Sequence, residues 1–228
     1  MKISKQTFDV LKNFSTINSG IVVDPGNKLR TISAQKNIMA LANVPEVFES
    51  RFAIYDLVQF INLTNSPVFM GGDFTFGDNS LQITNGKAKS TYRYTDENTI
   101  IQPTKKVNMP DSEIGFTLKE DDLQTIVSMS GILSKPDLSI SSSGDVIRLS
   151  VLDQKDPLSN TFDLDVGEGN GNVYNMYYKV ENLKILKGDY DVKISSQAIS
   201  HFKHNDLELE YWIALEPASE YGDDEDNA

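Results

Sequence analysis

The two halves of this chain repeat one order of segments, and that order limits the folds open to it. In each half a stretch with helical periodicity precedes alternating, strand-like runs, and a helix and further strands then follow. A helix with a single apolar face must bury that face, and the neighbouring strands provide an antiparallel sheet for it. The pattern predicts an α+β fold of two similar domains, although the letters of the two halves match little.

Four stretches are predicted to be helices. The first has Ser4 as its N-cap and places its lysines opposite an apolar face that includes Phe8, Leu11 and Phe14. The third begins with the capping-box spacing of Thr117 and Glu120. The predicted helices cover residues 4–18, 54–65, 117–135 and 179–188, the last being only one or two turns that end at Gly188.

Strands and turns account for nearly all of the remaining sequence. The dipeptide Asn85-Gly86 between two alternating runs is a strong hairpin signal. Two prolines and a polar run at residues 99–114 indicate an extended connector between the halves. We therefore expect an N-terminal domain at 1–102, a connector at 103–112, a C-terminal domain at 113–219 and an acidic tail at 220–228.

The formal charge of −12 argues against a protein that binds nucleic acid over its whole surface, because phosphates repel an acidic surface. Five of the acids lie in the last nine residues, so the rest of the chain carries about −7 and any basic surface must be local. The chain has no cysteine, which excludes disulfides and thiolate metal sites. No apolar run reaches the roughly 18–20 residues of a membrane helix, and no signal peptide is evident.

No constellation of residues predicts catalysis, a metal site or a cofactor. His201 and His204 form the only H-x-x-H and have no third ligand at a suitable spacing. Residues 167–172, GEGNGN, lack the lysine and helix of a phosphate-binding loop and read as a turn. The acids Asp163, Asp165 and Glu168 do not match a calcium loop, and the adjacent Asp121 and Asp122 fit capping of a helix dipole.

Several segments, in their order along the chain, resemble the DNA polymerase sliding clamps of T4-type bacteriophages. The most specific is KISKQTFDVLKNFSTINSGI at residues 2–21, and the shorter ones are AIYDL at 53–57, DLQ at 122–124, KGDY at 187–190 and YWIALE at 211–216. The resemblance implies a clamp fold whose three copies join head to tail into a ring, with sheets outside and helices lining the hole. It further implies a non-enzymatic protein, without a cofactor, in the cytoplasm of an infected bacterium.

The resemblance also implies the partners and the surface for DNA. Duplex DNA would pass through the hole unread, a clamp-loader ATPase would place the ring, and the DNA polymerase and late-transcription factors would bind it. Lysines suit weak, non-specific attraction to phosphates. Those expected to face the hole are Lys2, Lys5, Lys12, Lys119, Lys135, Lys184 and Lys187. One departure is that Ser128 and Gly131 stand where the family's third helix usually presents arginines.

Two further sites are assigned by analogy. Closure of a head-to-tail ring requires two different edges, which we expect in residues 89–95 and 145–151. The interface residues would be Tyr92, Tyr94, Ile147 and Leu149. A pocket for a partner peptide would include Ile101, Val107, Met109, Leu215 and Pro217, although these residues could equally pin the connector to its domain.

Two other classes of protein remain open from the sequence. One is a β-rich phage structural protein of the tail or capsid, and the other is an unrecognised β-rich hydrolase. The lysines of the first helix would then be an ordinary solvated face. Lysine-bearing helices at corresponding positions of both halves favour the clamp, because a structural module has no reason to align them.

Overall fold

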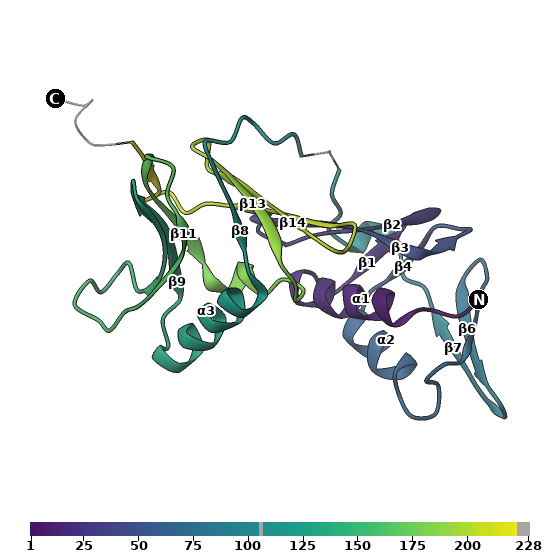
Figure 1. Ribbon diagram of the computed structural model, residues 1–228. Helices are drawn as coiled ribbons and strands as arrows, with labels where there is room; N and C mark the ends of the chain where they lie inside the picture. The colour runs from purple at the N-terminus through teal and green to yellow at the C-terminus, as the bar shows by residue number, and fades with distance from the viewer. Residues whose placement is uncertain (105–106, 223–228) are drawn as a thin grey trace. The chain divides into compact units, whose positions relative to one another are not determined.

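The computed structural model describes residues 1–104 and 107–222 (Figure 1). The acids at 223–226 of the predicted tail and two lysines of the predicted connector lie outside the described residues. The chain divides into two compact units, Met1–Lys106 with Leu207–Leu209 as unit 1, and Val107–Asp206 with Glu210–Ala228 as unit 2. The domain boundaries at 102, 112 and 219 stay a prediction. No described helix is both long and apolar enough to cross a membrane.

Unit 1 combines two helices with short antiparallel strands. β1 pairs with β4, β2 pairs with β3, and β5, β6 and β7 form a three-stranded sheet in that order. The elements are α1 (Lys5–Ile17), β1 (Ile21–Val23), β2 (Gly26–Ile32), β3 (Ile38–Phe48), β4 (Phe52–Ile54), α2 (Leu57–Thr64), β5 (Asp73–Phe76), β6 (Ser80–Asn85), β7 (Ala88–Arg93) and the 3₁₀ turn Glu97–Thr99.

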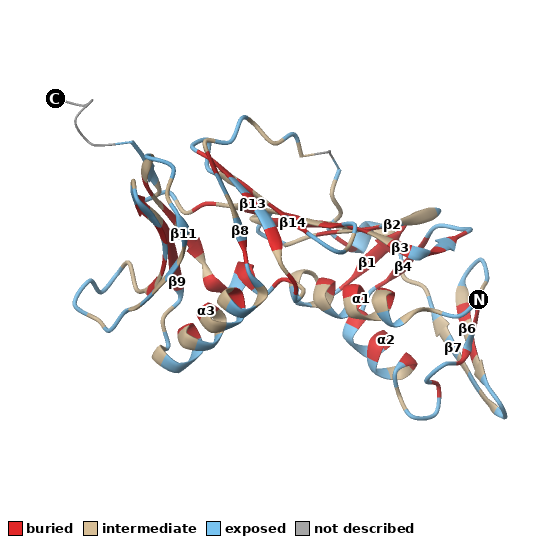
Figure 2. Cartoon of the chain, in the orientation of Figure 1, coloured by how far each residue is buried: buried red, intermediate tan, exposed pale blue. Residues whose placement is uncertain are grey.

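The apolar stripe of α1 explains its position in unit 1. Val10, Leu11 and Phe14 are buried, and α1 contacts β3 and α2. Figure 2 draws the buried part of the helix in red. Burying such a stripe supplies most of the stability of a helix this short. The opposite face of α1 remains in solvent.

Unit 2 also combines a helix with antiparallel sheets, and it has larger sheets than unit 1. β11, β10, β9, β12 and β16 form one antiparallel sheet in that order, and β15, β14, β13 and β8 pair in another. The elements are β8 (Ile114–Leu118), α3 (Glu120–Leu133), β9 (Asp137–Ser143), β10 (Val146–Leu152), β11 (Phe162–Glu168), β12 (Val173–Lys179), the 3₁₀ turn η2 (Val180–Leu183), β13 (Tyr190–Ser195), β14 (Ile199–His204), β15 (Leu209–Ala214) and β16 (Glu220–Tyr221).

Three helical predictions need correction. The fourth helix is only the 3₁₀ turn η2, because the backbone after it is bonded to tyrosines instead: the N–H of Leu186 donates to Tyr211 Oη, and Tyr190 Oη–H donates to the carbonyl of Leu186. Thr117 does not cap α3, because it belongs to β8 and the N-cap is Lys119. The second helix begins at Leu57 rather than near residue 54, because residues 52–54 form β4.

The predicted hairpin is confirmed with a small shift. β6 and β7 pair with Asn85 opposite Ala88, so the two turn residues are Gly86 and Lys87. Gly86 has φ of 58°, a left-handed conformation that a residue with a side chain adopts at a cost. The hairpin makes β7 the last strand of its sheet, and this edge is important for the site.

Candidate nucleic-acid interface

The solvent face of α1 carries its cations. Lys5, Lys12 and Thr16 are exposed on one stripe of the helix, and the side chain of Lys5 is 89% exposed. Asp9 lies on the same stripe and forms an ion pair with Lys5, with 2.6 Å between Nζ and Oδ2. Lys12 has no ion pair among the described residues. The stripe therefore presents two ammonium groups, one of them partly neutralised by a neighbour four residues away.

A carboxylate from a distant strand holds the start of α1. Ser4 is the N-cap, and its hydroxyl accepts from the N–H of Thr7 at 3.2 Å. Glu46 of β3, almost fully buried, accepts from the N–H of Ser4 and from the hydroxyl of Thr7. Burial alone would raise the pKa of Glu46, but these hydrogen bonds outweigh it and keep the pKa below its ordinary value. A negative charge here also favours the helix dipole.

The long helix of unit 2, α3, presents a different surface. Leu123, Ile126 and Ser130 are buried, and α3 packs on β10 and β11. The exposed face of α3 carries no cation. It combines polar side chains with one apolar side chain, Ile132, which is 70% exposed. The exposed residues of α3 are Asp121, Gln124, Ser128, Gly131 and Ile132.

The lysines next to α3 lie at its ends or beyond. Lys119 precedes the helix and pairs with Asp189 at 2.8 Å, and Lys135 follows the helix and is half-buried. Asp189 also accepts from the N–H of Glu120 at 2.9 Å, so it holds the start of α3 as Glu46 holds that of α1. The bonds from Lys119 and Glu120 lower the pKa of Asp189.

Lys184 and Lys187 extend from the loop between η2 and β13, and both are exposed. The two tyrosines that bond Leu186 fix this loop, and His204 Nε2 donates to the carbonyl of Lys187 at 3.1 Å. The loop has a defined backbone although it is not a helix. The lysines predicted on a fourth helix are therefore held on an ordered loop.

The two predicted edges differ in outcome. β7 is the end strand of its sheet, with the ring of Tyr92 against Phe60 and the ring of Tyr94 stacked on Phe52. β10 is not an edge, because it lies between β9 and β11. Its residues Ile147 and Leu149 are buried within unit 2, so the prediction of an edge at 145–151 is wrong. The strand next to β10, β11, is one of the two end strands of this sheet; its residues Phe162, Leu164 and Val166 are half-buried, and Asp163 and Asp165 are exposed.

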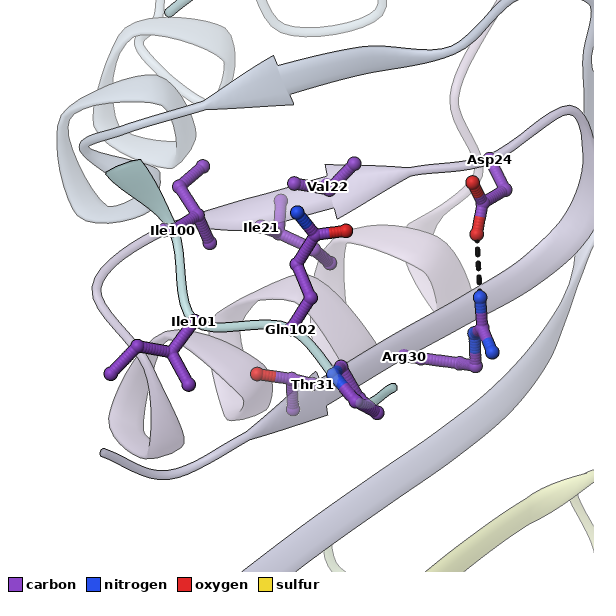
Figure 3. Close-up of a pocket in the computed structure, with 10 residues that line it drawn as sticks. Ile21, Val22, Asp24, Arg30, Thr31, Ile100, Ile101 and Gln102 are labelled. Carbon is purple, nitrogen blue, oxygen red and sulfur yellow. Dashed lines mark hydrogen bonds and ion pairs between the residues drawn. The ribbon is translucent and has the colours of Figure 1, made fainter. Parts of the chain in front are cut away.

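A small pocket lies where the chain leaves unit 1 (Figure 3). Its walls come from β1, β2 and residues 100–103, with the ion pair of Arg30 and Asp24 at its rim, 2.6 Å between Nη2 and Oδ2. Asn18 Nδ2 donates to the carbonyls of Ile32 and Ile101, each at 3.0 Å. These bonds tie the beginning of the connector to the body of unit 1.

Comparison with known proteins identifies the family. A model of the DNA polymerase processivity factor family matches residues 4–101, and a model of the C-terminal part of the gp45 sliding clamp matches residues 115–217. The sliding clamp of Vibrio phage KVP40 is 33% identical over 223 residues, which cover 95% of this chain and 99% of that protein. This chain belongs to the phage sliding clamp family. The sliding clamp of Enterobacteria phage T4 is 26% identical over 96% of this clamp and 98% of its own length.

Solved structures agree on the clamp fold. Proliferating cell nuclear antigen (PCNA) from A. fulgidus, bound to the C-terminal region of FEN-1, has a TM-score of 0.70 at 12% identity and covers 96% of this clamp and 100% of itself. PCNA from Entamoeba histolytica has a TM-score of 0.69 at 11% identity, over 94% of this clamp and 97% of that chain. The comparisons favour a clamp over the alternative of a tail or capsid protein.

The role of the lysines stays a prediction, and sequence reasoning missed the carboxylates that hold the first turns of α1 and α3. Glu46 and Asp189 lie far in sequence from the helices that they cap, and no local pattern marks them. The predicted peptide-pocket residues divide between the units: Ile101 belongs to unit 1 and lines the pocket of Figure 3, and Val107, Met109, Leu215 and Pro217 belong to unit 2. Their common role stays a prediction. No cluster of three acids or histidines suited to a metal occurs among the described residues.

Proposed function

We propose that three copies of this clamp close head to tail into a ring that encircles duplex DNA and tethers the replicative polymerase. The exposed lysine stripe of α1 carries the proposal, because the chain is acidic overall and gathers cations on the solvent face of one well-anchored helix. Lysine ammonium groups attract phosphates without reading bases, which a ring that slides needs. Lys2, Lys184 and Lys187 add further exposed cations.

The end strands β7 and β11 support head-to-tail closure. The exposed side chains along β7 include Lys87, Lys89 and Arg93 at and beside the strand, and those along β11 are the carboxylates of Asp163, Asp165 and Glu168. Opposite charges on two different edges favour contact between unlike edges and disfavour contact between like ones. Tyr92 and Tyr94 keep their predicted place at one edge, and β11 replaces β10 at the other.

An antiparallel register follows from the faces of the two strands. In this register Arg93 of one copy lies opposite Asp163 of the next, and Tyr92 lies opposite Leu164. The first pair joins two exposed residues and the second joins two half-buried residues. A slip of one residue would place Arg93 opposite the apolar side chain of Leu164 or Phe162. Asp163 has no ion pair among the described residues, whereas Asp165 already binds Arg148 at 2.7 Å in its own copy.

The remaining partners follow from the family. A clamp-loader ATPase would open and place the ring, and the polymerase, with late-transcription factors, would bind it through short apolar peptides near the connector. The clamp would act as a non-enzymatic accessory in the cytoplasm of the infected bacterium. Its part in replication would be to raise processivity by tethering.

A topological assay tests the proposed function. The clamp is loaded on nicked circular plasmid with the cognate loader and ATP, washed in high salt, and half of the sample is then linearised. We expect the clamp to stay on the circles and to leave the linear DNA, because a closed ring is held by topology rather than by phosphate contacts. Equal retention on circular and linear DNA would refute encirclement, and sedimentation of the free protein checks the trimer.

A further inference from the structure

The loop between β10 and β11 holds a leucine out in solvent. Leu158 is 97% exposed, the highest value among the large apolar residues described. The loop is nonetheless ordered by its own bonds, from Asp156 N–H to the carbonyl of Asp153 and from Ser159 N–H to the carbonyl of Asp156, both at 3.0 Å. Single exposed leucines are common, but this one sits on a fixed loop directly before the free edge strand β11.

The base of this loop is anchored to a buried carboxylate. Asp137, only 1% exposed, accepts from the N–H of Gln154 at 2.9 Å and from Lys179 Nζ at 2.5 Å. An ordered loop loses little conformational freedom when its tip is buried by a partner. Leu158 is therefore presented for contact with another surface at a low entropic cost.

Unit 1 has an open cleft at the end of β7, with a volume of about 590 Å³. Phe52 and Tyr94 form an aromatic wall, their ring centroids 5.2 Å apart and their planes inclined by 24°. Burial raises the pKa of Tyr94 to about 12, and its hydroxyl has no hydrogen-bond partner among the described residues. Polar and charged groups of both signs line the rest of the cleft, from Arg51, Asp78, Asn79, Arg93, Thr95 and Glu97.

The antiparallel register brings the loop to this cleft. With Arg93 opposite Asp163, Phe162 of the next copy lies opposite Tyr94, where β7 has just ended. The chain before Phe162 then continues past Tyr94, and the four residues back to Leu158 reach at most about 14 Å. The cleft residues Asn79 and Thr95 lie in that direction, since the N–H of Tyr94 donates to the carbonyl of Asn79.

We propose that Leu158 of each copy seats in the cleft beside Phe52 and Tyr94 of the next copy, forming a knob that locks the ring interface. The inference rests on the head-to-tail ring proposed above, and it adds a contact beyond the two strand edges. The occupant is a second copy of this chain because the edge beside the cleft is cationic and the edge beside the leucine is anionic. Phe52 and Tyr94 would contribute the aromatic side of the contact, and residues of that kind are enriched where interface energy concentrates.

Crosslinking tests the knob directly, because the natural chain has no cysteine. The variant Leu158→Cys with Asn79→Cys is treated with a short bismaleimide and run on a denaturing gel. We expect covalently linked oligomers. A matched control is Leu158→Cys with Val68→Cys: Val68 is exposed but lies at the other end of β7, since Asn85 Nδ2 donates to its carbonyl. The control should remain monomeric.

A second pair separates the knob from the ring. Thr91→Cys with Asp165→Cys reports the strand pairing alone, since the register places these residues opposite one another. Strand crosslinks without Leu158–Asn79 crosslinks would overturn the knob and leave the ring standing. Failure of both pairs would overturn the knob together with the proposed edges.

An affinity measurement gives an independent readout. Leu158→Ser should raise the dissociation constant of the trimer on the order of tenfold, and Leu158→Met should leave it nearly unchanged, because only the apolar contact matters. The residue is almost fully exposed in the single chain, so neither change threatens folding. Equal trimer stability for Leu158→Ser and the natural chain, measured by sedimentation over a dilution series, would refute the proposal.

Discussion

The long helices of the two units, α1 and α3, are built alike and charged differently. Each buries an apolar stripe within its own unit, and each has its first turn held by a carboxylate from a distant segment. Yet α1 shows Lys5 and Lys12 to solvent, and α3 shows Gln124, Ser128 and Gly131. The two units therefore share the packing and capping of their long helix, but only α1 carries lysines on its exposed face. The affinity of the clamp for phosphates should come mainly from unit 1.

The largest expected effect comes from reversing the charge of α1. Lys5→Glu with Lys12→Glu would place six new carboxylates on the DNA face of a trimer, and Lys5→Glu would also lie beside Asp9. Loading onto DNA should slow roughly a hundredfold at physiological salt, because phosphate contacts provide the non-specific attraction that brings DNA into the ring before it closes. Processivity in a loader-dependent replication assay measures the loss, and sedimentation shows an intact trimer.

The matched control moves the same charge elsewhere in unit 1. Lys28→Glu with Lys36→Glu changes two exposed lysines on β2 and the turn after it, with the same change in net charge. If this pair reduced processivity as strongly as the pair on α1, net charge rather than the helix face would explain the effect. The contrast between α1 and α3 would then lose its meaning.

A smaller effect is expected from the carboxylate that caps α1. Glu46→Gln replaces a group that accepts two hydrogen bonds with an amide whose NH₂ faces a donor, so unit 1 should lose about 1–2 kcal/mol. The pKa of Glu46 is lowered in the folded state, so its contribution is present above the ordinary pKa of 4.5 and lost as the pH falls through the folded value. Thermal unfolding at pH 7 and at pH 3 measures both.

The unfolding temperatures of the natural clamp and of Glu46→Gln should therefore become more similar in acid. The unfolding temperature of the natural clamp should fall towards that of Glu46→Gln between pH 5 and pH 3. Asp189→Asn is the corresponding change at α3, and it should have the weaker effect because Asp189 is far more exposed than Glu46. A constant difference between the natural clamp and Glu46→Gln at every pH would show that the charge of Glu46 is not what holds α1.

Adding cations to α3 should make the two helices more alike. Ser128→Lys with Gly131→Lys places two ammonium groups on its exposed face, and a Cβ built on Gly131 meets nothing within 4 Å. Loading onto DNA should become roughly fivefold faster, with a steeper dependence on salt. Ser128→Gln with Gly131→Gln adds similar bulk without charge, and an equal gain in that control would contradict the electrostatic explanation.

The sequence predicted those parts of the clamp that local pattern determines. The period of the apolar residues located α1 and α3, and Asn85-Gly86 located the hairpin. It failed where distant segments decide the outcome. Tyr190 and Tyr211 satisfy the backbone at Leu186 and replace a helix there. The position of β10 inside its sheet depends on β11, which begins only at Phe162. Glu46 could not be recognised as a cap because nothing near it in sequence is a helix start.

The smallest effect concerns the intrinsic strength of the two helices. α1 contains no glycine, whereas Gly131 lies inside α3 with open space where a Cβ would be. Gly131→Ala should stabilise unit 2 by about 0.5–1 kcal/mol, since alanine leaves the unfolded chain less freedom and suits a helix better. Gly86→Ala is the opposing control, because φ of 58° at that turn disfavours a side chain. Chemical denaturation should separate the two variants in opposite directions, and a loss of stability in Gly131→Ala would mean that α3 needs its glycine for a contact outside the single chain.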